Sequence, residues 1–179
     1  MSHELTPDSR PPRRKILRLR GFDYSALGPY FVTVCVAGKR CILGDVTKDT
    51  VELSPLGEIA REVMVNLPAR FAALLLDHHI IMPNHVHALL ALVGAGLAPP
   101  GCNPATYVKL GDVIGAFKSL STIEINRRCG TPGAQFWQRG FYEHIIRSGE
   151  SMNDVRRYIS QNPIRWTAAL ENTPRKRHA

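Results

Sequence analysis

Long apolar runs are missing from this sequence, and none approaches the roughly 20 residues that a helix needs to span a bilayer. The N-terminal stretch MSHELTPDSRPPRRK also lacks the apolar segment of a secretory signal. The four cysteines form no CxxC pair and lie far apart, so the motif of a paired-cysteine zinc or redox site is absent. We therefore expect a cytoplasmic protein, not bound to a membrane, whose cysteines are free thiols.

Acidic residues are also few: 15 Asp and Glu stand against 23 Lys and Arg, which gives a formal net charge of +8. At 179 residues the chain is long enough for one domain with a hydrophobic core and too short for two of ordinary size. A small basic domain is explained most simply by a polyanionic partner, either nucleic acid or an anionic membrane surface. The lack of apolar anchors favours nucleic acid.

Basic residues gather at both ends of the chain. Arg13, Arg14 and Lys15 lie in a stretch rich in Pro and Arg and are candidate contacts to a phosphate backbone. The same composition is typical of an arm that is only solvated, and both interpretations stay open. The expected organisation is a flexible arm over residues 1–20, a folded domain over 21–167 and a basic tail over 168–179.

Turn and capping residues divide the central domain into strands and helices. Ser54 followed by Pro55 is typical of a helix N-cap and first helical residue, and Gly130 of a helix stop. Pro68 and Pro163 are expected to end the helices before them. The expected strands are 30–36, 41–44, 50–53, 72–77 and 80–92, the expected helices are 55–67, 110–128 and 151–161, and 135–147 is expected to be extended. This order favours an α+β sandwich with helices on one face of a largely antiparallel sheet.

The stretch IIMPNHVHALLAL, residues 80–92, carries two histidines, His85 and His87, two positions apart. Residues i and i+2 of a strand point to the same face, so both imidazoles can converge on one metal ion while Val86 and Ala88 face the other way. A lone histidine on an apolar strand is more often a hydrogen-bonded core residue. Two on one face favour a metal site.

Tyr158 and Asn162 lie four residues apart near the end of the last expected helix, so both project from one helical face. The amide oxygen of Asn162 is a candidate third metal ligand. A phenol has a pKa of about 10 and is a poor nucleophile while protonated, and a neighbouring divalent cation favours its phenolate. The alternative is a structural role, with Tyr158 in the core and Asn162 as a C-cap.

Aromatic and cationic residues alternate in the segment QFWQRGFYEHIIR, residues 135–147. Such a pattern can stack bases and hold phosphates, which makes Trp137, Arg139, His144 and Arg147 candidate DNA contacts. The pattern is equally typical of a strand with one buried face.

Three motifs occur together: MPNHVH around the two histidines, FWQRGFYEHIIR, and RRYISQNP with Tyr158 and Asn162. This combination resembles the single-tyrosine HUH transposases. The similarity is greatest to the branch of REP-associated tyrosine transposases, which GFDYSALGPYFVTVC near the N-terminus and GAFKS at residues 115–119 also resemble. It extends from about Arg18 to Trp166, nearly the whole chain.

The resemblance implies a ferredoxin-like core with both histidines on a central strand. It implies a divalent cation, Mg²⁺ or Mn²⁺, held by His85, His87 and, by position, Asn162. It implies Tyr158 as the nucleophile that attacks a phosphate of single-stranded DNA, leaving a 5′-phosphotyrosine and a free 3′-hydroxyl that can later rejoin strands. Lys118, in the similar GAFKS segment, joins the candidate DNA contacts. The implied partner is single-stranded or hairpin DNA, including palindromic repeats that flank the gene.

Other interpretations compete at particular residues. HVH begins the pattern of the histidine-triad hydrolases, but the next alternate position is Leu89 instead of a third histidine. Tyr142 is the alternative nucleophile, although no candidate ligand stands at a helical spacing from it. A basic module that binds DNA hairpins without cleaving them is the alternative function. The roles of His78, His79 and His144 stay open, as does the choice between a monomer and a homodimer that exchanges the last helix.

Overall fold

The computed structural model describes residues 27–93, 108–147 and 149–171. The predicted arm, with Arg13, Arg14 and Lys15, lies outside the described residues. The elements are β1 (Gly28–Cys35), the short 3₁₀ helix η1 (Ala37–Lys39), β2 (Gly44–Thr47), β3 (Thr50–Leu53), α1 (Pro55–Arg70), β4 (Leu74–Met82), β5 (His85–Leu92), α2 (Leu110–Cys129), β6 (Tyr142–Ile145), α3 (Met152–Ser160) and α4 (Asn162–Glu171).

Four strands form one antiparallel sheet in the order β4-β5-β1-β6. With the helices, the order along the chain is β1-α1-β4-β5-α2-β6, which is the βαββαβ pattern of ferredoxin-like folds. β2 and β3 form a separate hairpin between β1 and α1. The predicted α+β class and the largely antiparallel, ferredoxin-like sheet are therefore confirmed.

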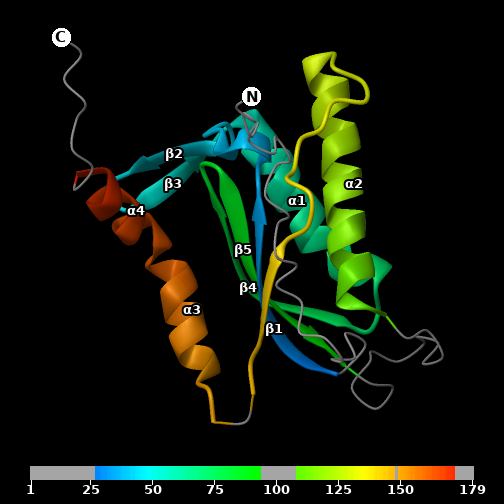
Figure 1. The fold of residues 1–179 in the computed structure, drawn as a ribbon, viewed down its shortest axis with the longest axis vertical. Coiled ribbons are helices and arrows are strands. Elements are labelled where there is room, and N and C mark those ends of the chain that lie inside the picture. The colour runs from blue at the N-terminus through cyan, green and yellow to red at the C-terminus, as the bar shows by residue number, and fades with distance from the viewer. Residues whose placement is uncertain (1–26, 94–107, 148, 172–179) are drawn as a thin grey trace, which may run out of the picture.

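Helices lie on both faces of this sheet, as Figure 1 shows, whereas the sequence predicted helices on one face. α1 and α2 cover the face that carries the main core, to which β5 contributes Val86, Ala88 and Leu90. α3 packs on the other face, where Leu89 and Ile159 belong to a smaller apolar cluster. The one-face prediction was wrong because the short apolar stripe of α3 is buried by the second face of the sheet.

Capping residues set the ends of α1 and α2. The Ser54 hydroxyl accepts a hydrogen bond from the Gly57 N–H at 3.2 Å and donates one to the Ile42 carbonyl at 2.7 Å. α1 continues past Pro68, contrary to prediction, because a proline in the last turn removes only one backbone hydrogen bond and its fixed φ is helical. Gly130 ends α2 as predicted, in the left-handed conformation with φ 65°.

The apolar run 80–92, which the sequence placed in one strand, is divided between two. β4 continues to a tight turn at Pro83 and Asn84, and β5 begins after it. His78 and His79 therefore lie inside β4 and not between strands. The prediction missed this because apolar residues continue on both sides of the turn, which only the Pro-Asn pair marks.

Two helices replace the single predicted last helix. α3 ends at Ser160, and α4 begins at Asn162 and continues to Glu171, so it enters the stretch predicted as a tail from residue 168. Pro163 interrupts the first helix as expected. It then stands in the first turn of α4, where a missing N–H breaks no hydrogen bond and its fixed φ is helical.

Only the last part of the predicted extended segment forms a strand, β6. Phe136 and Trp137 before it belong to the core under α1 and α2, and Trp137 is 3% exposed. The Trp137 Nε1–H donates to the Ser121 hydroxyl at 2.8 Å. The prediction that Trp137 contacts DNA is wrong for this fold, because the ring is enclosed and its polar atom is already bonded.

Two expectations from composition can be compared with the described ranges. Cys35, Cys41 and Cys129 are free thiols, as predicted, and Cys102 lies outside those ranges. None of the helices in the described part of the chain combines the length and apolar character that crossing a bilayer requires.

We expect Gly57→Ala to destabilise the protein by about 1–3 kcal/mol, because a Cβ there would collide with the backbone carbonyl of Leu43. Gly115→Ala in α2 is the matched control, since a Cβ at Gly115 meets no atom within 4 Å. That change should stabilise the protein by up to about 1 kcal/mol, because alanine is the better helix former. Urea unfolding measures both variants, and equal effects would contradict the close contact of α1 with Leu43.

Candidate active site

His85 and His87 are the first and third residues of β5, and both rings point to the face of the sheet that α3 covers. In the register with β1, His85 lies opposite Cys35 and His87 opposite Thr33. Val86 between them faces the core under α1 and α2. The two Nε2 atoms are 3.0 Å apart and the ring centroids 4.5 Å apart. The pleat of the strand therefore brings the two imidazoles together.

The second ring nitrogen of each histidine has a polar partner. Asn84 donates from Nδ2 to the Lys39 carbonyl at 3.3 Å, so its Oδ1 is the atom that accepts from Nδ1 of His85 at 2.7 Å. Nδ1 of His87 lies 2.9 Å from the Thr33 hydroxyl. Partners at Nδ1 fix the rings and direct both Nε2 atoms to one point, which is how metal-binding histidines are oriented.

Burial lowers the pKa of both histidines, to about 4 for His85 and to about 3 for His87. Desolvation is the largest cause in each case. At His85 a hydrogen bond from the ring to the side chain of Asn162 opposes this lowering of the pKa, and the charge of Lys39 adds to it. Both rings are therefore neutral at physiological pH, which is the form that ligates a metal.

The donor set fits a divalent cation. Two nitrogens bound to one ion at about 2.1 Å and at right angles would lie about 3.0 Å apart, which matches the separation of the Nε2 atoms. Within the ranges that the structure describes, no three His, Cys, Asp or Glu side chains lie together as a metal site, so a third protein ligand would have to be of another type. Asn162 is 7% exposed and its side chain hydrogen-bonds to His85, so its amide is the candidate for this third ligand.

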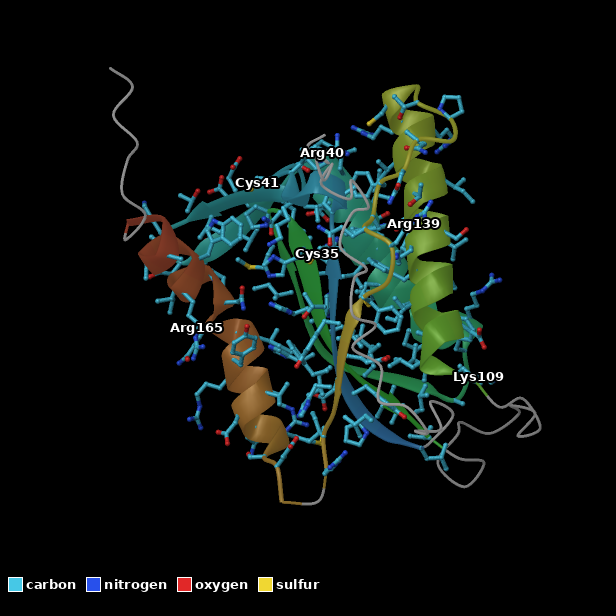
Figure 2. All side chains as sticks on the ribbon, in the orientation of Figure 1. Cys35, Arg40, Cys41, Lys109, Arg139 and Arg165 are labelled. Atoms are coloured by element: carbon cyan, nitrogen blue, oxygen red, sulfur yellow. The ribbon has the colours of Figure 1, made fainter. Side chains whose placement is uncertain are left out.

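Tyr158, on α3, lies against the histidine pair. Its ring centroid is 5.6 Å from that of His87 and 5.7 Å from that of Phe31, and both contacts are edge-on. The side chain is 37% exposed, so solvent and substrate can reach it. Arg165 lies on α4 (Figure 2). Its guanidinium stands 5.0 Å from the Tyr158 ring centroid.

Tyr142, the alternative nucleophile, lies on β6 and is separated from the histidines by β1. Thr33 stands between Tyr142 and His87 in the register of the sheet. The Tyr142 ring contacts that of Phe31 edge-on at 6.4 Å. Tyr158 is therefore the tyrosine that lies beside the histidine pair.

Three neighbours of the histidine rings were not among the residues predicted for the site. Phe31 stacks on one ring at 5.1 Å, Trp166 lies 6.0 Å from the other, and Thr33 bonds to a ring nitrogen. Trp166 follows Asn162 by four residues, so helical spacing could have indicated it if α4 had been recognised. Phe31 and Thr33 had no such signal, because their position depends on the pairing of β1 with β5.

Four predicted DNA contacts come from other parts of the fold: Lys118, Arg139, His144 and Arg147. Lys118 donates to the backbone carbonyls of Gln138 and Gly140 at 2.5 and 3.1 Å, so its ammonium fixes the chain before β6. His144 pairs with Glu150 at 2.8 Å, close to the start of α3. Both arginines are exposed and can reach a phosphate.

α3 is joined to β4 by polar contacts between residues far apart in the chain. The Arg156 guanidinium donates two hydrogen bonds to the Asp77 carboxylate, at 2.7 and 2.6 Å. Nε2 of His78 lies 2.9 Å from the Ser160 hydroxyl. His78 therefore helps to hold the helix that carries Tyr158. His79 lies on the same strand, and burial is the main cause that lowers its pKa.

Comparison with known proteins shows which of them share the sequence or the fold of this chain. No family model matches the chain. A Haemophilus influenzae protein described as uncharacterized is 29% identical over 165 residues, which cover 86% of this chain and 89% of the relative. A solved REP-associated tyrosine transposase bound to a REP hairpin matches with a TM-score of 0.53 and 21% identity, over 78% of this chain and 68% of that chain.

The chain has the fold of that transposase. A Deinococcus radiodurans protein with a provisional assignment as a transposase also matches, with a TM-score of 0.41 and 19% identity over 79% of this chain and 94% of that chain. In this transposase fold, the candidate site combines β5, α3 and the start of α4.

The Asp77–Arg156 pair gives a test of how α3 is held. The hydrogen bond from Arg156 is the main cause that lowers the pKa of Asp77. A lowered pKa means that the pair stabilises the folded protein above the ordinary aspartate pKa of about 3.9, and that this stabilisation is lost as the pH falls through the lowered value. Arg156→Gln should therefore reduce the protection of α3 amides from hydrogen exchange at pH 7, and the difference from wild type should shrink as the pH falls through the lowered pKa of Asp77.

Arg157→Gln is the control on the same helix, because Arg157 pairs with Asp154 of α3 itself, at 3.6 Å between exposed groups. Protection should change little in that variant. If Arg156→Gln protects α3 as well as wild type at pH 7, the ion pair does not hold the helix.

Proposed function

We propose that the protein is a metal-dependent single-stranded DNA nuclease and strand transferase, a member of the REP-associated branch of the single-tyrosine HUH transposases. The observation that carries this proposal is the convergence of Tyr158 and Asn162 on the neutral pair His85 and His87. The net charge of +8 and the shared fold with a transposase that is bound to a hairpin support hairpin or single-stranded DNA as the substrate.

In the proposed reaction the hydroxyl oxygen of Tyr158 attacks a phosphorus atom of the DNA strand. The new bond from phosphorus to the tyrosine oxygen forms as the bond to the 3′ oxygen breaks. The phenol proton passes, on balance, to the leaving 3′ oxygen, so the products are a 5′-phosphotyrosine and a free 3′-hydroxyl. A later attack by a 3′-hydroxyl reverses these bond changes and rejoins a strand without a nucleotide cofactor.

The neighbours of Tyr158 suit this role. The edge-on contacts with His87 and Phe31 restrict the orientation of the phenol ring, which lowers the entropy lost on reaching the reactive geometry. The cationic side chain of Arg165 beside the ring favours the negative charge that develops on the phenol oxygen.

A divalent cation, Mg²⁺ or Mn²⁺, is the proposed cofactor, and His85, His87 and Asn162 would hold it. When bound, it would polarise the phosphate and favour the phenolate form of the tyrosine. Imidazole ligands are softer than Mg²⁺ prefers, so Mn²⁺ should serve better in vitro. Asn84 and Thr33 contribute by holding the two rings in place.

Covalent trapping tests the nucleophile. Wild-type protein incubated with a labelled single-stranded hairpin and Mn²⁺ should give an adduct that survives denaturing electrophoresis. Tyr158→Phe should abolish the adduct while hairpin binding stays within about twofold of wild type, because only the attacking oxygen is removed. Tyr142→Phe is the matched control and should retain the adduct.

An adduct in Tyr158→Phe would show that the nucleophile is another residue. Wild-type protein that binds hairpins but gives no adduct with any of them would indicate a hairpin-binding module without catalysis.

Mn²⁺ binding in the absence of DNA, measured by calorimetry, tests the cofactor. His85→Ala combined with His87→Ala should abolish binding, and Asn84→Ala should weaken it by about 10- to 100-fold, because the ring of His85 loses its orienting partner. Asn66→Ala is the control, since this exposed α1 side chain bonds to the Glu62 carbonyl at 2.9 Å. Chelation of the metal should also stop adduct formation. Unchanged Mn²⁺ affinity in the double-histidine variant would overturn the proposed cation site.

A further inference from the structure

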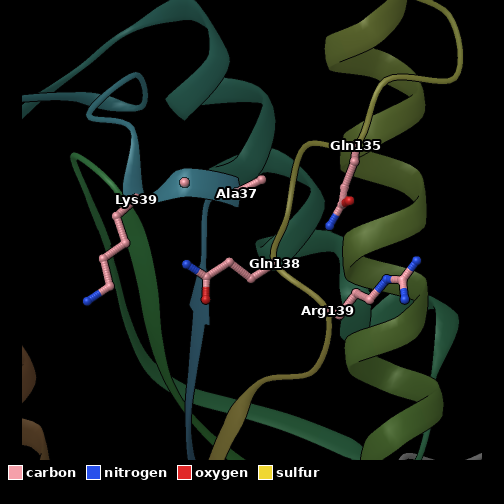
Figure 3. A pocket seen from close by; sticks show the side chains of 6 residues that line it. Ala37, Lys39, Gln135, Gln138 and Arg139 are labelled. Atoms are coloured by element: carbon pink, nitrogen blue, oxygen red, sulfur yellow. The ribbon is translucent and has the colours of Figure 1, made fainter. Parts of the chain in front are cut away.

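A cavity of about 610 Å³ lies between η1 and the segment that leads into β6 (Figure 3). Two of its lining residues are cationic, two carry side-chain amides and none is acidic. They are Ala37, Gly38, Lys39, Gln135, Gln138 and Arg139. The volume is within the range of about 300–1,000 Å³ that is typical of ligand sites. The lining therefore has the charge and the size to take an anionic ligand.

Hydrogen bonds join this cavity to the candidate active site. The side chain of Asn84 donates to the Lys39 carbonyl at 3.3 Å and accepts from His85 at 2.7 Å. The Asn84 carbonyl accepts from the Val36 N–H at 2.9 Å, just before η1. One asparagine thus contacts both the wall of the cavity and a candidate metal ligand. The cavity wall at Lys39 is therefore separated from His85 by a single side chain, that of Asn84.

Lys39 is held in an unusual backbone conformation, with φ 55°. Lys48 and Asp49 also have positive φ, but they form the two-residue turn between β2 and β3, where both central residues need that conformation. Lys39 lies at the end of η1, where no hairpin requires it. A lysine in the left-handed region is strained, and strain of this kind is concentrated at functional positions.

The polar groups are arranged for an extended ligand. Figure 3 shows Lys39 and Arg139 on opposite sides of Gln138. The Gln138 side chain has no hydrogen-bond partner among the described residues, and its backbone is fixed by Lys118 at 2.5 Å. Gln135 uses one amide hydrogen on the Trp137 carbonyl at 2.9 Å, which leaves its oxygen free to accept. A strand that crosses the cavity would meet a cation at each end and amides between them.

We propose that this cavity binds nucleotides of single-stranded DNA directly adjacent to the scissile phosphate, with Lys39 and Arg139 on phosphates and the amides of Gln135 and Gln138 on base edges. Cations position a nucleic-acid backbone, and amides can pair with the donors and acceptors of an unpaired base. The inference rests on the proposed function, since it takes DNA as the substrate. It assigns the cavity the selection of the sequence next to the cut.

Binding measurements with chemically altered DNA test this assignment. Full-length protein carrying Tyr158→Phe, which cannot cleave in the proposed reaction, is titrated with hairpins that bear single-stranded flanks. One phosphate at a time is replaced by a neutral methylphosphonate. Lys39→Gln should weaken binding of the unmodified DNA by about three- to tenfold and reduce the salt dependence by about one phosphate contact. When the neutral linkage replaces the one phosphate that Lys39 contacts, the protein with Lys39 and the Lys39→Gln variant should bind the DNA with equal affinity.

Lys48→Gln is the matched control, because it removes the same charge from a lysine with the same left-handed backbone, φ 48°, at the tip of the β2–β3 hairpin. The effect of Lys48→Gln on DNA affinity should be the same whichever phosphate is replaced by the neutral linkage. Gln138→Ala should weaken binding to a flank that carries a base but not to one with an abasic site at the same position.

One result would be that the losses of DNA affinity caused by Lys39→Gln and by a neutral linkage are additive in free energy at every position of the flank. In that case the cavity does not hold the strand, and the inference is overturned. Adduct formation by wild-type protein tests the proposed function separately. Coupling of Lys39 to one phosphate without any adduct would support the cavity and contradict the chemistry, and an adduct without coupling would do the reverse.

Discussion

The alternation of side chains along β5 is the constraint on which the rest of the structure depends. One face of this strand gives Val86 and Ala88 to the core under α1 and α2, and the other gives His85 and His87 to the side that α3 covers. A shift of one residue would exchange these two sets, placing the imidazoles in the core and apolar side chains in the site. The pairing of β5 with strands on both sides prevents this shift. The backbone hydrogen bonds that stabilise the sheet therefore also position the candidate metal ligands.

The second face of the sheet holds its helix less firmly than the first. The cluster under α3 contains few fully buried residues, and the contacts of Arg156 with Asp77 and of His78 with Ser160 add to the docking of the helix. An element with few buried apolar contacts opens locally at a smaller free-energy cost than the core does. The candidate nucleophile thus depends on residues of β4 that take no part in the chemistry.

The turn between β4 and β5 connects two functions. Asn84 belongs to this two-residue turn, orients the ring of His85 and holds the carbonyl of Lys39 at the edge of the cavity. The cavity wall and a candidate metal ligand thus share one amide as a hydrogen-bond partner.

The sequence by itself determined the α+β class, the helices that became α1 and α2, and the common face of His85 and His87. These features follow from periodicity and capping, which act over a few neighbouring residues. Only the tertiary structure decided that Trp137 is a core residue, that α3 covers the second face of the sheet, and which residues of β1 contact the histidine rings. Register and helix docking are set by packing between distant segments, and a local pattern of residues carries no information about which segment becomes the neighbour.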